Sequence, residues 1–128
     1  MSFATEKATI ERYVRDNLTG SSLVFENMTQ PNTVAEWIRV NILNADSKQV
    51  SLGDNPYYRY TGLVIFQIFT KPSIGSGRAT QVVDQVTAMF RGQRINGITF
   101  RPPVMDKVGD AGGWYQVNVS VPFFREEV

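Results

Sequence analysis

The 128-residue chain contains no cysteine and no histidine. Without cysteine it has no disulfide framework, no thiolate nucleophile and no cysteine-ligated zinc or iron–sulfur site. Without histidine it lacks the commonest metal ligand and the side chain whose charge changes near neutral pH. Ser-His-Asp catalysis and HExxH metalloprotease chemistry are therefore excluded for this chain alone. These absences predict a protein that is not an enzyme and that holds no metal or cofactor.

The chain also lacks a charge surplus and a long apolar run. Its 13 Lys and Arg residues against 12 Asp and Glu residues give a net charge of +1, which attracts neither nucleic acid nor an anionic membrane. The longest apolar run, Leu63–Phe66, is far too short to cross a bilayer. Residues Met1–Lys7 lack the basic and apolar regions of a signal peptide. We expect a soluble, non-exported protein with no membrane partner and no sequence-specific nucleic-acid partner.

What the chain does contain is enough apolar material for one core. Hydrophobic residues make up 42% of the sequence and aromatic residues 12%. A chain of this length buries roughly two-thirds of its surface when it folds, whereas two halves of it would each be too small for a good core. The sequence therefore predicts a single domain over residues 1–128.

Two segments have the apolar spacing of helices. The first is Phe3–Leu18, with Ser2 as N-cap and Gly20 as stop, and its polar side includes Glu6. The second is Arg78–Arg91, with Ser76 as cap and Gly92 after its end. Their expected core residues are Ala4, Ala8, Ile10, Val14 and Leu18 in the first helix, and Ala79, Val82, Val83, Val86, Met89 and Phe90 in the second.

Alternating apolar and polar residues predict that the rest of the chain is mainly strand. Apolar residues fall on both faces of Tyr58–Thr70, which indicates a central strand covered on both sides by helix, loop or another subunit. The fold class is α+β: a largely antiparallel sheet of about five to six strands with two helices packed on it. The expected strands are Leu23–Phe25, Trp37–Ile42, Lys48–Leu52 (joined to the previous one by a turn at Asn44–Ser47), Tyr58–Thr70, Ile95–Arg101 and Trp114–Phe124, with a long loop at Val104–Gly113.

Three patterns resemble ligand or catalytic sites, and each is incomplete. Gly75–Gly77 lies between a strand and a helix, where a nucleotide phosphate would bind, but Thr80 replaces the third glycine of the dinucleotide motif. Asp106 and Asp110 lack the alternating ligands of a calcium loop. Pairs of carboxylates are expected to be solvated, because none of the 12 acidic residues sits inside an apolar strand. A small-molecule or nucleotide-binding module that uses the Gly75–Gly77 turn stays open as an alternative.

The charges are unevenly distributed. Residues 71–107 contain six basic residues against two acidic ones, a local charge of +4 that leaves −3 for the rest. This segment includes Arg78, Arg91 and Arg94. It lacks the interleaved aromatics of a single-strand binder, so a contact with an acidic face of a neighbouring subunit is favoured over a nucleic-acid contact.

The order of elements resembles that of a known family. The N-terminal helix is followed by the strand Arg59–Ile68 with an internal glycine, then by Pro72–Gly77 leading into a helix that begins at Arg78. The chain ends with the aromatic strand within Gly112–Phe123. This pattern is similar to the small bacteriophage tail terminator-like proteins, which include lambda tail-terminator-like proteins and a phage-related family of unknown function. The resemblance covers nearly the whole chain.

The resemblance implies a structural protein of a phage or prophage tail. Such a protein forms a ring with copies of itself, typically a hexamer, that caps the tail tube. It ends polymerisation of the major tail-tube protein and presents a surface to the head–tail connector. Its place is the virion tail, after assembly in the host bacterial cytoplasm. The head–tail joining (neck) proteins of the same phage group have a similar size and element order and stay open as an alternative.

Two segments are expected to make the contacts within that assembly. Tyr57, Tyr58, Arg59 and Tyr60 form an aromatic and arginine cluster of the kind enriched at protein interfaces. The second segment is the Val104–Gly113 loop, with Asp106, Lys107 and Asp110.

Overall fold

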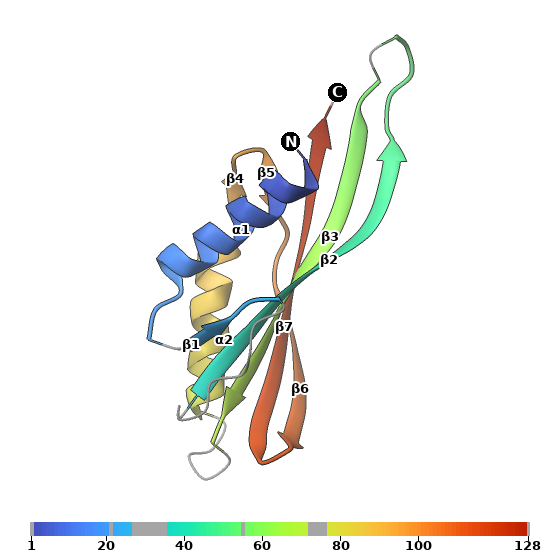
Figure 1. The fold of residues 1–128 in the computed structure, drawn as a ribbon. Coiled ribbons are helices and arrows are strands. Elements are labelled where there is room, and N and C mark those ends of the chain that lie inside the picture. The colour runs from blue at the N-terminus through green and yellow to red at the C-terminus, as the bar shows by residue number, and fades with distance from the viewer. Residues whose placement is uncertain (1, 21, 27–35, 55, 72–76, 128) are drawn as a thin grey trace.

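The fold confirms the α+β class. The structure is a computed structural model that describes residues 2–20, 22–26, 36–54, 56–71 and 77–127. These residues form two helices and a curled sheet (Figure 1). In chain order the elements are α1 (Phe3–Asn17), β1 (Ser22–Val24), β2 (Glu36–Gln49), β3 (Tyr58–Thr70), α2 (Gly77–Phe90), β4 (Arg94–Ile95), β5 (Ile98–Phe100), β6 (Val104–Ala111) and β7 (Trp114–Glu127).

The sheet has seven strands in the order β1-β2-β3-β7-β5-β4, and β6 also pairs with β7. Among the strands that the structure describes, β1 and β2 are the one parallel pair, and the other pairs are antiparallel. The long strand β7 has β3 along one side. Its other side is shared, because β6 pairs with residues 114–120 and β5 with residues 123–125. The middle of the sheet is therefore β3 and β7, as the apolar residues of β3 predict.

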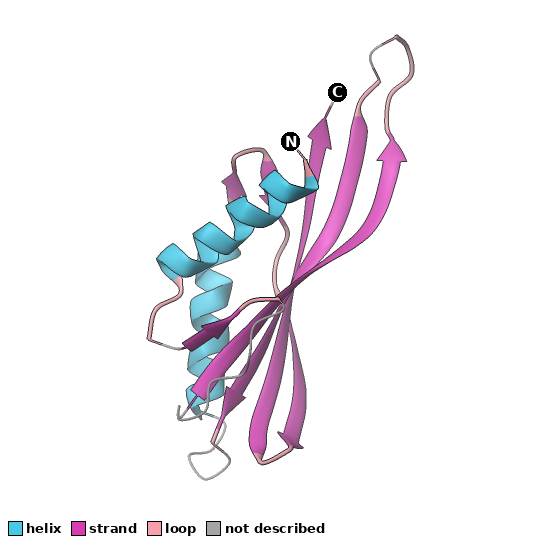
Figure 2. Cartoon of the chain, viewed as in Figure 1, coloured by secondary structure: helices cyan, strands magenta, loops and turns pink. Residues whose placement is uncertain are grey.

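Both helices lie on the same face of the sheet (Figure 2). The hydrophobic core lies between the two helices and the sheet, and on the sheet side it contains inward-facing residues of β2, β3, β5 and β7. All six residues predicted for the second helix are buried there. In β3, Val64, Phe66 and Ile68 alternate with half-buried residues that point to the opposite face, which neither helix covers.

The predicted N-cap of helix α1 is confirmed, but only some of the core residues predicted for this helix are buried. The Thr5 backbone N–H donates to Ser2 Oγ at 3.1 Å, as an N-cap requires. Ile10 and Val14 are buried, and so is Leu18 just after the helix. The predicted core residues Ala4 and Ala8 are exposed instead, because the helix is rotated so that another residue of its first turns, Glu6, faces the sheet (see below).

Two predicted loop and strand boundaries were wrong, and tight turns explain both. The Val104–Gly113 loop is strand β6, which folds back on β7 through Gly112 and Gly113 at φ 58° and 84°. The predicted Ile95–Arg101 strand is a small hairpin, β4 and β5, with Asn96 and Gly97 at φ 49° and 86°. Both are two-residue turns whose positive φ values match the twist of the flanking strands.

The predicted turn at Asn44–Ser47 was also wrong. It is a β-bulge inside the continuous strand β2, where the register with β3 shifts between Asn44 and Asp46. The hairpin therefore closes further on, where the Val50 N–H donates to the Tyr57 carbonyl at 2.8 Å. As a result β2 and β3 form a long two-stranded arm. Strand β3 pairs with β7 over its whole length, so only the loop at the tip of this arm projects beyond the end of β7 (Figure 1).

Candidate interface surfaces

The sheet face opposite the helices, called the open face here, is covered by neither helix (Figure 2). The strand registers place side chains of neighbouring strands in rows across it. One row holds Leu43, Leu63 and Pro122, and the next holds Asn41, Ile65 and Ser120 with Val104 at the edge. A third row is polar and contains Arg39, Gln67, Asn118 and Asp106. The open face therefore combines an apolar band with a polar one, a mixture typical of contact surfaces.

An aromatic cluster lies next to the polar row, at the end of the sheet where β2 begins. Trp37 stacks on Phe69 with ring centroids 4.2 Å apart, and Trp114 meets Trp37 edge-on at 6.3 Å. The Arg39 guanidinium lies 5.3 Å from the Trp37 ring. Both Trp37 Nε1 and Arg39 Nε are buried and have no hydrogen-bond partner within the described part of the chain. Unpaired buried donors are costly, so this cluster favours the approach of an acceptor.

At the other end of the open face, two arginines flank one aromatic ring. Arg59 lies 5.1 Å and Arg101 5.2 Å from the centroid of Phe124. Arg59 is also ion-paired with Glu126, to which its Nε donates at 2.9 Å. This corner presents Arg101 as an exposed cation held in place by a ring.

The predicted Tyr57–Tyr60 cluster is divided by the fold. Tyr57 and Tyr58 are exposed where the loop at the tip of the arm meets β3, and they remain available for contact. Tyr60 faces the helix side of the sheet, where the Arg125 guanidinium lies 4.4 Å from its ring and Phe3 meets it edge-on. Arg59 lies on the open face. Strand alternation places Arg59 on the face opposite Tyr58 and Tyr60, and Tyr60 is covered by Arg125 and Phe3, so the four cannot act as one patch.

Tyr60 belongs to a buried ionic cluster that sequence reasoning missed. Glu6 is 1% exposed and Arg125 is 2% exposed, and the Arg125 Nε donates to Glu6 Oε1 at 2.8 Å. Asn44 Nδ2 donates to the other Glu6 oxygen at 2.9 Å, and Glu127 accepts from Arg125 Nη1 at 3.0 Å. The expectation that acidic residues would be solvated was therefore wrong for Glu6. A charged residue in the first turn of an amphipathic helix is normally expected to be exposed. The residue that pairs with Glu6 lies 119 residues away, so no local pattern indicates the pair.

The predicted basic residues lie on different parts of the subunit. Arg78 is held within the subunit by a two-pronged ion pair with Glu36 at 2.7 Å. That hydrogen-bonded carboxylate raises the pKa of Arg78 above its ordinary value. Arg91 and Arg94 are exposed near the far end of α2, a helix length away. The local charge of +4 therefore does not form a single basic patch.

The predicted contact residues Asp106, Lys107 and Asp110 are exposed on strand β6 rather than on a loop. Around them Val104 and Val108 are 54% and 50% exposed, and Met105 is 41% exposed. An edge strand with exposed apolar side chains is a template for association. Of the contact residues predicted from the sequence, those of β6 are therefore the ones that lie on an exposed edge strand beside exposed apolar side chains.

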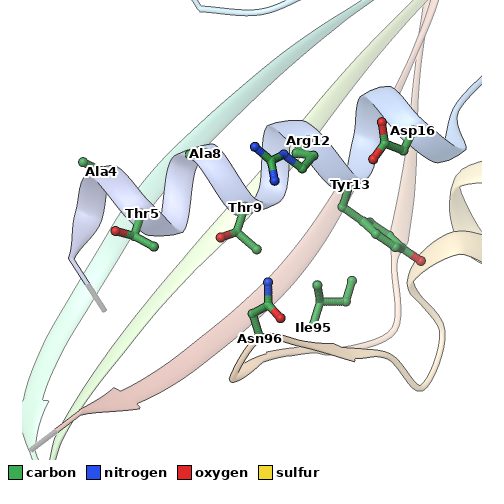
Figure 3. Close-up of a pocket in the computed structure, with 9 residues that line it drawn as sticks. All are labelled: Ala4, Thr5, Ala8, Thr9, Arg12, Tyr13, Asp16, Ile95 and Asn96. Carbon is green, nitrogen blue, oxygen red and sulfur yellow. The ribbon is translucent and has the colours of Figure 1, made fainter.

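A hollow of about 490 Å³ lies between α1 and the β4–β5 turn (Figure 3). Small and polar residues line it, among them Thr5, Thr9 and Asn96, and its charged lining within the described residues is Arg12 and Asp16. The Tyr13 hydroxyl points away and donates to the Met89 carbonyl at 2.6 Å. The hollow offers one cation beside one anion, which is poor chemistry for a phosphate.

Most of the turn proposed for the nucleotide alternative lies outside the described residues. Gly75 and Ser76 lie outside the described residues, and Gly77 is the first residue of α2. Within the described residues, no three side chains gather as metal ligands. No helix described in the structure is long and apolar enough to span a membrane.

Comparison with known proteins shows both a family and a fold. A family model described as phage tail terminator protein matches residues 4–123. No curated protein matches the chain. Fifteen chains of solved structures match. One of these solved structures has 17% sequence identity and a TM-score of 0.74, over 100% of this chain and 97% of its own length. At that identity, the likeness shows the fold alone.

Proposed function

The chain belongs to the phage tail terminator family, and we propose that it assembles into a ring of six copies that caps the finished tail tube. The ring ends polymerisation of the major tail-tube protein and offers the head–tail connector a surface to bind. The protein acts through shape and carries out no catalysis. It is assembled in the host bacterial cytoplasm and remains in the virion tail.

The observation that best supports this proposal is the distribution of exposed apolar side chains. Apart from Phe3 of α1, the exposed large apolar side chains of the described residues lie on the β2–β3 arm at one flank of the sheet and on β6 at the other. Two unlike contact surfaces on opposite flanks of one subunit are what a heterologous ring needs, because each copy offers one surface to each neighbour. The family match favours the terminator over the neck protein.

The direct test combines the purified protein with polymerising tail-tube protein. The expected result is tubes of limited length that carry one added ring at an end, seen by negative-stain electron microscopy. A ring that closes only on the tube also predicts a monomer in light scattering of the protein alone. Tubes that grow to the same length with and without the protein would refute the proposal.

A further inference from the structure

Besides the short end strands β1 and β4, the sheet has two longer strand edges that have no partner strand within the described residues. Strand β1 pairs with only Trp37–Arg39 of β2, so the outer edge of residues 41–49 is open. Two backbone groups of that edge are occupied by side chains: the Ile42 N–H donates to Glu26 Oε1 at 2.8 Å, and the Ser47 N–H donates to the carboxylate of Asp46 at 2.9 Å. On the opposite flank β6 pairs with β7 along one side, and its other side is open. Unpaired backbone groups of this kind readily accept another strand.

The β2 and β6 edges run in opposite directions, which allows them to pair as antiparallel strands. Each of the pairs β2–β3, β3–β7 and β7–β6 is antiparallel, so β2 and β6 point in opposite directions. Rotation about a ring axis preserves these directions from copy to copy. The β6 edge of one copy therefore meets the β2 edge of the next as an antiparallel pair.

The edges are also offset along the strands. The open part of β2 lies level with residues 58–65 of β3, whereas β6 lies level with residues 65–70 of β3 across β7. The two centres differ by about six residues, or about 20 Å at 3.4 Å per residue. Four strands span about 19 Å at 4.8 Å per strand. Joining the edges thus inclines the strands by about 45°, near the tilt of about 35–45° at which sheets close into barrels.

Side chains along the two edges are complementary as well. The β2 edge and arm carry Lys48 and the 41%-exposed Val50, and β6 carries Asp106 and the 54%-exposed Val104. Lys48 and Asp106 both project on the open-face side, by the registers with Arg59 and Asn118. Antiparallel pairing that sets Lys48 opposite Asp106 also sets Val50 opposite Val104, since each step forward on one strand is a step back on the other.

We propose that the outer edge of β2 in one copy pairs with the outer edge of β6 in the next, so that the sheets of the ring join into one closed sheet. This inference rests on the proposed ring. It places both helices on the outside and makes the open face the wall of the channel, with the polar row Arg39, Gln67, Asn118 and Asp106 repeated around it.

Because the chain has no cysteine, the contact can be tested by disulfide trapping. Lys48→Cys protein is mixed with Asp106→Cys protein, the tube is added, and the sample is oxidised. The expected product is a crosslinked dimer in the mixture, and a ladder up to the full ring in the double variant. The matched control is Asp16→Cys with Arg94→Cys, two exposed charged positions on the helix side, which should stay uncrosslinked.

A second variant tests the backbone pairing itself. The Ser47 N–H points to the outer edge, where it donates to the Asp46 carboxylate at 2.9 Å, and in the closed sheet a carbonyl of the neighbouring β6 takes the place of that carboxylate. Ser47→Pro removes this donor from the outer edge of β2, and Ser47→Ala retains it. We expect Ser47→Pro to abolish ring formation while its melting temperature remains near that of Ser47→Ala, which still forms rings.

The outcomes separate this inference from the proposed function. Capped tubes without β2–β6 crosslinks, or with crosslinks in the control pair only, would overturn the closed sheet and leave the terminator function standing. Capped tubes formed equally well by Ser47→Pro would also overturn it. If no variant and no wild-type protein ever caps a tube, both proposals fail.

Discussion

The buried pair of Glu6 and Arg125 should be the most sensitive polar contact in the subunit. The change Glu6→Gln keeps the side-chain shape but removes the charge that faces an arginine only 2% exposed. Breaking such a pair costs about 3–5 kcal/mol, because the remaining charge is left in a poorly solvated site. Arg125 keeps Glu127 and the ring of Tyr60 as neighbours. The lower end of this range, about 3 kcal/mol, is therefore expected.

This loss converts into a melting-temperature shift. An unfolding entropy of about 2.1 cal/mol/K per residue gives about 0.27 kcal/mol/K for this chain, so the melting temperature should fall by about 11 °C. Thermal unfolding followed by circular dichroism measures the shift, and urea unfolding with an unchanged m-value confirms that the native state is the one affected.

The adjacent residue provides the control. Lys7 pairs with Glu26 at 3.5 Å, and both side chains are solvent-accessible. Lys7→Gln should cost no more than about 0.5 kcal/mol, or about 2 °C, and the cost should shrink further in high salt. The effect of Glu6→Gln should persist at high salt because the pair is buried. A Glu6→Gln shift no larger than that of Lys7→Gln would show that the reasoning about burial is wrong.

Three further results are expected. Gly62→Ala should destabilise by about 1–3 kcal/mol in urea unfolding, because a Cβ there would lie 2.6 Å from the Leu43 carbonyl oxygen, which the sheet holds in place. Burial raises the pKa of Tyr13, so the stability gained from its protonated form is complete below the ordinary tyrosine pKa and is lost as the pH rises above it. Tyr13→Phe should cost about 1 kcal/mol at pH 8 through the lost bond to Met89, and should flatten the alkaline decline in urea unfolding. Leu52→Ser changes a side chain that is 93% exposed, so the melting temperature of the monomer should stay within about 2 °C while capping of tubes weakens.

Local patterns were reliable where one face of an element is apolar. The spacing in α2 identified all six of its buried residues, and the alternation in β3 gave both ends of that strand. These patterns are local because helix and strand periods repeat within a few residues. The two-residue turns Asn96–Gly97 and Gly112–Gly113 were also visible as hairpin signals, and reading them would have corrected β4, β5 and β6.

Other features left no local signal. The bulge at Asn44 in β2 depends on how that strand meets β3, and the burial of Glu6 depends on an arginine at the other end of the chain. Likewise, Tyr58 and Tyr60 share one face of β3, and they differ because Phe3 and Arg125 cover the Tyr60 ring while Tyr58 stays exposed.

The sequence by itself determined the absence of histidine and cysteine chemistry, the α+β class and the likeness to phage tail terminators, because composition, periodicity and element order are properties of a linear chain. Only the tertiary structure decided which residues are available to partners. In the folded chain Arg78 forms an ion pair within the subunit, and Tyr60 packs against a buried ionic cluster. The edges of β6 and β2 stay open on opposite flanks of the sheet. Exposure is set by contacts between segments far apart in the chain, so no pattern within a single segment specifies it.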